Sequence, residues 1–261
     1  MSGPDARTFA QSQFTGDINH ADEHHWMPTA WCDPKGRCLS VILLKTHQDS
    51  VHLVFPLAQT ETLKRLQLFA IGRKVEFIPS KRVCASIEPS SAPMAGGTLP
   101  GPAKRWLWLA DESVARPPSS DWLRRWQLAD MAAAIPWLTS RTSARFLPQF
   151  LDLEAHEGLS FRKGCYPGQE VIARLHYLGT VKYRLSAFRS QDVVNRWSPG
   201  DPLQLINEDG KLEVLDALEN DGQQVGLVVV PAALAAGQTV SITDSGRQPA
   251  TLQLVHPSTL C

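Results

Sequence analysis

The side chains best suited to chemistry lie in one short segment, which runs from Lys163 to Glu170. A thiol, Cys165, and a phenol, Tyr166, stand between a cation and a carboxylate, with two glycines among them. Pro167 is typical of the first turn of a helix, where its missing N–H is not needed. We therefore expect Cys165 just ahead of a helix N-terminus and close to Lys163. Both neighbours favour the thiolate, which is the nucleophilic form of cysteine.

The residues after this segment continue the helical pattern. Glu170 and Arg174 are spaced for an ion pair between successive turns, and Val171 to Ala173 supply an apolar face. The composition is also compatible with a simpler structure, a glycine-containing turn with a half-buried cysteine and solvated cations.

The segment resembles the signature of the YgfZ-type folate-binding proteins, relatives of the glycine-cleavage T protein, an aminomethyltransferase. That signature is K-G-C-Y-x-G-Q-E followed by an Arg. The matching residues are Lys163, Gly164, Cys165, Tyr166, Gly168, Gln169, Glu170 and Arg174. Pro167 takes the variable position. Weaker similarities at 3–17, 33–36 and 146–149 extend the resemblance over most of the chain.

The resemblance implies an α+β fold. An aminomethyltransferase-like folate-binding body, residues 1–179, would be followed by a small C-terminal antiparallel β-barrel, residues 180–261. The residues favour the same order, because short apolar runs separated by turn sequences follow a mixed helix and strand pattern. The middle module, near 83–121, is shorter than in the family, and the sequence lacks the apolar strand that usually precedes the first helix. Both departures predict a more open ligand pocket.

Local patterns predict the individual elements. Helices are expected at 4–14, at 63–70 and from about 121, and strands at 41–44, 51–55, 74–78 and 106–109. The strand at 41–44 is a continuous apolar run, which indicates burial on both faces. Residues 89–104 are rich in Pro, Gly, Ser and Ala, which predicts a loop or linker.

Tetrahydrofolate joins a flat pterin to a benzoyl-glutamate tail, so its site requires an aromatic or apolar slot, a polar partner for the pterin edge and cations for the tail. The resemblance implies that Trp126, which begins a segment ending at Pro136, contacts folate. Its spacing from Trp122 alone favours core packing. The family's pterin-binding Glu falls within 132–134, which are all alanine, so Asp130 is the candidate replacement.

The signature residues complete the expected folate site. They are Lys163, Tyr166, Gln169, Glu170 and Arg174, with Cys165 as the functional thiol.

Glycine cleavage itself is not expected. The aminomethyltransferase uses an aspartate in a hairpin, and the matching position here, counted from Gly36, is Ser40. A serine hydroxyl cannot take the role of that carboxylate. The resemblance instead implies a tetrahydrofolate-binding accessory protein that supports iron–sulfur cluster assembly or repair and tRNA modification. Its partners would be iron–sulfur client enzymes or assembly proteins.

Two other functions stay open. One is a folate-dependent one-carbon transferase acting on an unknown substrate. The other is a non-enzymatic module that docks a partner through the signature loop. Reactivity of Cys165 separates both folate-dependent functions from the docking module.

The composition limits the expected binding partners and cellular compartment of the protein. Lysine plus arginine and aspartate plus glutamate both number 26, so no overall field attracts nucleic acid or membrane. No apolar run reaches the roughly 18 residues of a membrane span. The five cysteines form no C-x-x-C pair, and a cytoplasmic location is expected. The histidines and acids at 20–25 are expected to be solvated rather than metal ligands.

Overall fold

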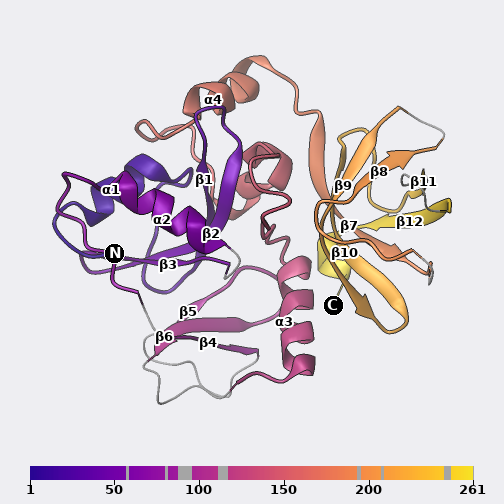
Figure 1. Cartoon of the computed structure of the whole chain (residues 1–261), viewed down its shortest axis with the longest axis horizontal. Helices are drawn as coiled ribbons and strands as arrows, with labels where there is room; N and C mark the ends of the chain where they lie inside the picture. Colours follow the sequence, from indigo (N-terminus) through magenta and orange to yellow (C-terminus); the bar gives the residue numbers. More distant parts are fainter. Residues whose placement is uncertain are drawn as a thin grey trace.

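The computed structural model describes residues 1–56, 59–79, 82–87, 96–110, 117–192, 195–206, 209–243 and 248–260. The described strands form a sheet β1-β2-β3, a sheet β4-β6-β5 and a closed six-stranded barrel. Figure 1 shows the helix α3 between the second sheet and the barrel. Among the described residues, no helix is both long and apolar enough to cross a bilayer.

The N-terminal part surrounds one antiparallel sheet. Its elements are α1 (Ala6–Gln13), β1 (Met27–Cys32), β2 (Cys38–His47), β3 (Ser50–Val54) and α2 (Thr60–Leu68). The central strand β2 is buried at every position but its last, so the prediction of a strand buried on both faces is confirmed. The helices expected at 4–14 and 63–70 are also present.

The prediction of a strand at 74–78 is wrong. Only Glu76 is bridged, by two backbone hydrogen bonds with Ser2. Gly3, at a φ of 106°, then turns the chain away into α1, so the pairing does not continue.

The middle part contains β4 (Arg82–Ile87), β5 (Gly97–Thr98), β6 (Arg105–Ala110) and α3 (Ser120–Ala132). The predicted strand at 106–109 and the predicted helix near 121 are confirmed. Ser119 caps α3 by accepting a hydrogen bond from the Trp122 N–H. Of the loop predicted at 89–104, residues 89–95 lie outside the described part of the chain.

Two short 3-10 helices, η2 (Pro148–Leu151) and η3 (Leu153–His156), lead to α4 (Gln169–Leu178). The helix begins two residues later than the expected start at Pro167, because Gly168 has a φ of 80°. A Cβ at Gly168 would lie 2.5 Å from the Asp33 carbonyl oxygen and from the Gly36 Cα. The close approach of the β1–β2 hairpin therefore requires glycine here.

The barrel contains β7 (Tyr183–Ser190), β8 (Pro202–Leu205), β9 (Lys211–Asn220), β10 (Gln223–Pro231), β11 (Thr239–Thr243) and β12 (Ala250–Val255), followed by η4 (Pro257–Thr259). It closes in the order β10-β7-β12-β11-β8-β9, with antiparallel pairing. This confirms the predicted C-terminal barrel. One hydrophobic cluster joins body and barrel, since it includes Cys38, Tyr166 and Ile172 together with Leu185 and Leu227. The signature loop therefore lies over a core that both parts share.

Candidate functional site

Lys163 anchors the signature loop to the N-terminal part of the chain. Its Nζ donates hydrogen bonds of 2.7 Å to the carbonyl oxygens of both Phe14 and Gly16. The side chain is only 9% exposed. Burial lowers the pKa of the Lys163 ammonium to about 8, and the Asp17 carboxylate partly opposes that shift. The lysine is thus a structural tie across almost 150 residues and not a surface cation.

Tyr166 is the second anchor of the loop. It belongs to the shared core cluster, together with Cys32 and Cys38. Its hydroxyl donates to the Ser160 carbonyl at 3.4 Å, and the Lys163 Nζ lies 5.3 Å from the centre of its ring. Burial, chiefly, raises the pKa of the Tyr166 phenol well above its usual range, so the phenol stays protonated at neutral pH.

Cys165 is exposed, whereas Lys163 and Tyr166, which flank it in the loop, are held in place. Lys163 and Tyr166 are both buried, and the two residues between them, Gly164 and Cys165, are exposed to solvent. Gln169 closes the loop by donating to the Lys163 carbonyl at 3.3 Å. The loop thus offers a fixed, accessible thiol.

The expected ion pair on α4 does not form. Glu170 and Arg174 are both exposed, and no contact within 4.0 Å joins their charged groups in this described segment. Solvation of two exposed long side chains competes with such a pair. Both charged side chains are therefore exposed to solvent on α4.

Asp130 lies in a buried polar cluster away from this loop. Its Oδ1 pairs with the guanidinium of Arg105, and its Oδ2 accepts a 2.9 Å hydrogen bond from the Trp137 indole. Burial raises the Asp130 pKa, while the Arg105 charge opposes the rise. The Trp126 ring lies 5.0 Å from the Arg105 guanidinium carbon and stacks on Trp122, with ring centres 5.2 Å apart. Both oxygens of the expected pterin carboxylate thus already have partners within the chain.

Two adjoining cavities are found in the described part of the chain, the larger between the body and the barrel and the second within the body. The larger, about 410 Å³, is lined by Pro100, Gly101, Pro102, Ala132, Ala133, Ala134, Asp152, Ala155, His156, Arg184, Leu185, Ser186, Ala236, Val255, His256, Pro257 and Ser258. The second, about 330 Å³, shares Pro100, Ala155 and His156 with it. We call the larger one the alanine cavity, after 132–134. Its size is in the range of small-molecule sites.

The alanine cavity combines an apolar wall with a cationic one. Asp152, His156, Arg184 and His256 supply its charged or titratable groups. Arg184 is oriented by its Nε, which donates to the Leu234 carbonyl at 2.9 Å. Burial raises the Asp152 pKa, with His156, Arg184 and His256 opposing, and burial lowers the pKa of His156. A carboxyl group beside an arginine and two imidazoles suits a ligand with both hydrogen-bonding edges and anionic ends.

The expected site residues do not meet in one place. None of Lys163, Cys165, Tyr166, Gln169, Glu170, Arg174, Trp126 and Asp130 lines either of these two cavities. Trp126 packs against the cluster that contains Ala133, so it lies behind the cavity wall. The alanines at 132–134, where the resemblance places the family's Glu, line the alanine cavity. No motif marked the polar groups opposite, because they come from η3, β7 and the segment after β12.

Ser40 is fully buried on β2, and its Oγ donates to the Val41 carbonyl at 3.2 Å. A hydroxyl committed to the backbone offers no acid or base to a substrate.

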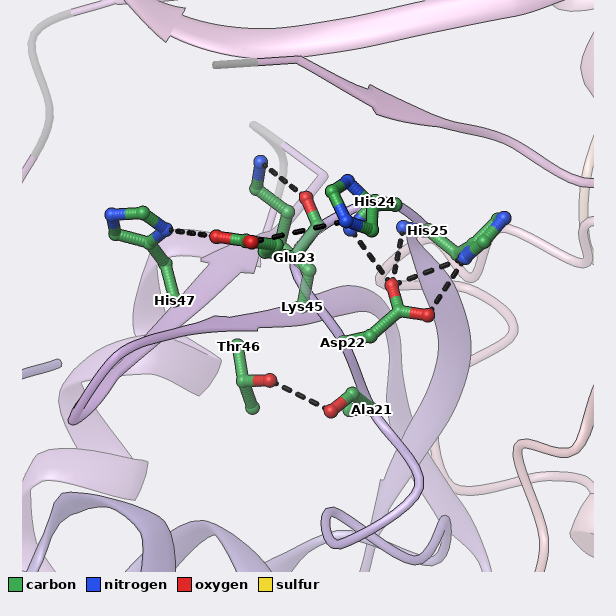
Figure 2. A network of polar contacts seen from close by, with 8 residues as sticks. All are labelled: Ala21, Asp22, Glu23, His24, His25, Lys45, Thr46 and His47. Atoms are coloured by element: carbon green, nitrogen blue, oxygen red, sulfur yellow. Dashed lines mark hydrogen bonds and ion pairs between the residues drawn. The ribbon is translucent and has the colours of Figure 1, made fainter. Parts of the chain in front are cut away.

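The acids and histidines at 22–25 form a network with β2 (Figure 2). Asp22 contacts the His25 ring, and Glu23 contacts the His47 ring, each at 2.8 Å. Among the residues that the structure describes, no group of three or more His, Cys, Asp or Glu side chains is placed to hold a metal ion. The network ties the loop before β1 to the sheet.

The arrangement of body and barrel defines an aminomethyltransferase-like fold. The fold matches the crystal structure of the glycine cleavage system aminomethyltransferase T from Bartonella henselae, with a TM-score of 0.75 over 100% of this chain and 82% of that one, at 14% identity. No family model matches the chain.

Among sequence relatives, the chain is 29% identical to the tRNA-modifying protein YgfZ of Colwellia psychrerythraea, covering 97% of this chain and 90% of the relative. It is 27% identical to that of Vibrio atlanticus, covering 95% and 85%. The resemblance to YgfZ-type proteins is therefore confirmed along nearly the whole chain.

Proposed function

We propose that this chain is a folate-binding accessory protein of the YgfZ type, which supports iron–sulfur cluster assembly or repair and tRNA modification through the thiol of Cys165. The observation that carries the proposal is the construction of the signature loop. Two buried anchors, Lys163 and Tyr166, hold an exposed cysteine between them. A protein that needed only a turn at this place would not require a buried ammonium, whose desolvation is costly.

The alanine cavity is the proposed site of tetrahydrofolate. Ala132, Ala133 and Ala134 offer an apolar surface for the flat pterin, and Asp152 is a carboxyl group for its edge. Arg184 supplies positive charge for the glutamate carboxylates, and His256 lines the same cavity with a ring that can hydrogen-bond. These groups fit folate in kind. When bound, folate supplies a one-carbon carrier, while the chain's own residues orient it and exclude water.

The signature residues have a different role in this proposal. Gln169 and Tyr166 shape the loop, whereas Glu170 and Arg174 present charges to a partner beside the thiol. The partners proposed are iron–sulfur client enzymes or assembly proteins, in a cytoplasmic setting.

A one-carbon transferase is the second candidate, and Ser40 weighs against it. General acid–base help from a positioned side chain contributes about 10²–10⁴-fold, and the buried Ser40 hydroxyl cannot provide it. A pure docking module is the third candidate. It is favoured by the exposed apolar side chains on α4, where Tyr177 is 64% and Leu178 is 83% exposed.

The folate site is tested by titrating tetrahydrofolate into the protein while tryptophan fluorescence is recorded. Arg184→Met should weaken binding by roughly 1.5–3 kcal/mol, the range for a charged hydrogen bond. Trp126→Ala tests the alternative that the indole itself stacks on folate, which predicts a loss of about 1–3 kcal/mol. Lys182→Met is the control, because Lys182 is exposed. Wild-type affinity in Arg184→Met would place folate outside the alanine cavity.

The thiol is tested by limited alkylation followed by peptide mass analysis. Cys165 should be labelled before Cys32, Cys38 and Cys84, because it is the exposed one of these four. Cys165→Ala should keep the fold and the folate affinity, yet fail to restore iron–sulfur enzyme activity in cells that lack the protein. Cys84→Ala is the matched control and should restore it. Full rescue by Cys165→Ala would favour the docking module.

A further inference from the structure

A second pair of thiols lies beneath the signature loop. Cys32 is the last residue of β1 and Cys38 is the first of β2, on either side of the hairpin turn 33–37. Their Sγ atoms are 3.9 Å apart, and the two residues are 2% and 0% exposed. The pair belongs to the same hydrophobic cluster as Tyr166.

The backbone around the pair brings the two side chains together. Cys38 faces Cys32 across the ladder, but its N–H donates to the Phe146 carbonyl and its carbonyl accepts from the Ala144 N–H, each at 2.8 Å. Cys32 and Cys38 are therefore cross-strand partners in which the backbone of Cys38 bonds elsewhere, next to an irregularity of the register between Trp31 and Cys32. The facing positions and the 3.9 Å between the Sγ atoms leave only a small movement of the side chains before a disulfide can form.

We propose that Cys32 and Cys38 are a redox modification site that closes into a reversible intramolecular disulfide. The oxidant is a hydroperoxide. One thiol is oxidised to a sulfenic acid as the peroxide O–O bond breaks and releases water. The sulfur of the second thiol then attacks the sulfenic sulfur, the S–S bond forms, and the sulfenic oxygen leaves as a second water. Two thiols and one hydrogen peroxide thus give one disulfide and two waters.

Burial sets the conditions for this reaction. Desolvation, above all, raises the pKa of the Cys32 thiol, which keeps the pair unreactive while the core is closed. Oxidation therefore requires a small, uncharged oxidant and a local opening of the hairpin, and it is slower than reaction of the exposed Cys165. A reducing compartment would return the pair to thiols, as for other transient intracellular disulfides.

The disulfide would restrict the hairpin turn against which the signature loop packs. Gly36, at the tip of the hairpin, packs against Gly168, Leu147 and Ile172, and a Cβ there would lie within 3.1–3.3 Å of them. Closing the base of the hairpin restricts the turn on which Gly168 rests. The inference requires neither folate binding nor reactivity at Cys165.

The test uses the full chain carrying Cys84→Ser, Cys165→Ser and Cys261→Ser, so that only the pair remains. The folded protein is treated with hydrogen peroxide, quenched with acid, unfolded and alkylated with a maleimide. Intact mass should show both maleimide adducts lost, with a protein two hydrogens lighter, and a dithiol reductant should restore both adducts. Hydrogen exchange of the amides at 33–38 should slow in the oxidised protein.

Cys38→Ser in the same background is the matched control, because it cannot form the intramolecular bond and should keep one alkylatable or peroxide-modified thiol. The proposal is overturned if the pair keeps both adducts after treatment, if sulfinic or sulfonic acid accumulates at Cys32 or Cys38, or if the disulfide forms only in denaturant. Thermal unfolding before and after treatment establishes that the protein stayed folded.

Discussion

Replacing Lys163 with Met tests whether a buried ammonium holds the signature loop. The substitution keeps the length of the side chain but removes both hydrogen bonds, to the carbonyls of Phe14 and Gly16. Each carbonyl left without its partner costs about 1–3 kcal/mol. The relieved desolvation of the ammonium, about 3 kcal/mol for a pKa near 8 instead of 10.5, offsets part of this cost. At pH 7 we expect Lys163→Met to lower the free energy of unfolding by up to about 3 kcal/mol.

The stability difference between wild type and Lys163→Met should depend on pH, and the two pKa values of Lys163 determine the direction of that dependence. The pKa of Lys163 is about 8 in the folded protein and near 10.5 when the chain is unfolded. Between these values the unfolded chain binds more protons, so wild-type stability should rise with pH relative to Lys163→Met. Below pH 8 the difference should be constant.

Urea unfolding at pH 7, 8, 9 and 10 measures the difference directly, with Lys182→Met as the exposed control. Alkylation of Cys165 provides a second measurement, since a released loop should change the labelling rate. A difference in stability between wild type and Lys163→Met that does not change from pH 7 to 10 would refute the assignment of a buried, charged anchor.

Two further predictions concern buried or partly buried titratable residues outside the signature loop. Arg105→Met should destabilise the protein by about 3–5 kcal/mol, because it leaves the Asp130 carboxylate buried without its charge partner. The double variant Arg105→Met/Asp130→Leu should lose less stability. Urea unfolding in which the double variant loses more stability than the single one would contradict this prediction. Burial lowers the pKa of His52 to about 4, and its Nδ1 has no partner, so wild-type stability should fall between pH 6.5 and 4 more steeply than that of His52→Gln. Equal slopes of Tm against pH in the two proteins would argue against it.

Patterns that extend over several residues predicted the fold well. The run Val41 to Leu44 is apolar at every position, as expected for a strand covered on both faces, and it lies in β2, which is such a strand. The turn-separated apolar runs after residue 180 closed into the expected barrel. The error at 74–78 has the opposite cause. Strand propensity there was local, but a strand requires a partner, and only Ser2 pairs with it.

The site was less predictable because its parts come from distant segments. Lys163 and Tyr166 looked like ligand-binding groups in the sequence, whereas the structure places both side chains inside the protein. Nothing local shows whether a lysine points outward, since its partners are carbonyls almost 150 residues away. Asp152, at the junction of η2 and η3, and Arg184 line one cavity for the same reason, since η2 contacts β7, a contact that no spacing rule contains.

Three differences from the aminomethyltransferase pattern bear on whether this chain could act on a folate-bound group. The Ser40 hydroxyl donates to the Val41 carbonyl, alanines stand where the resemblance places the pterin-binding Glu, and Asp130 is held by Arg105. None of these three positions offers a free carboxylate to a bound folate. The anchors of the signature loop remain, although they cost desolvation of a lysine that no catalytic role on this chain requires. These features support the proposal that the chain presents Cys165 to a partner rather than transferring a one-carbon unit.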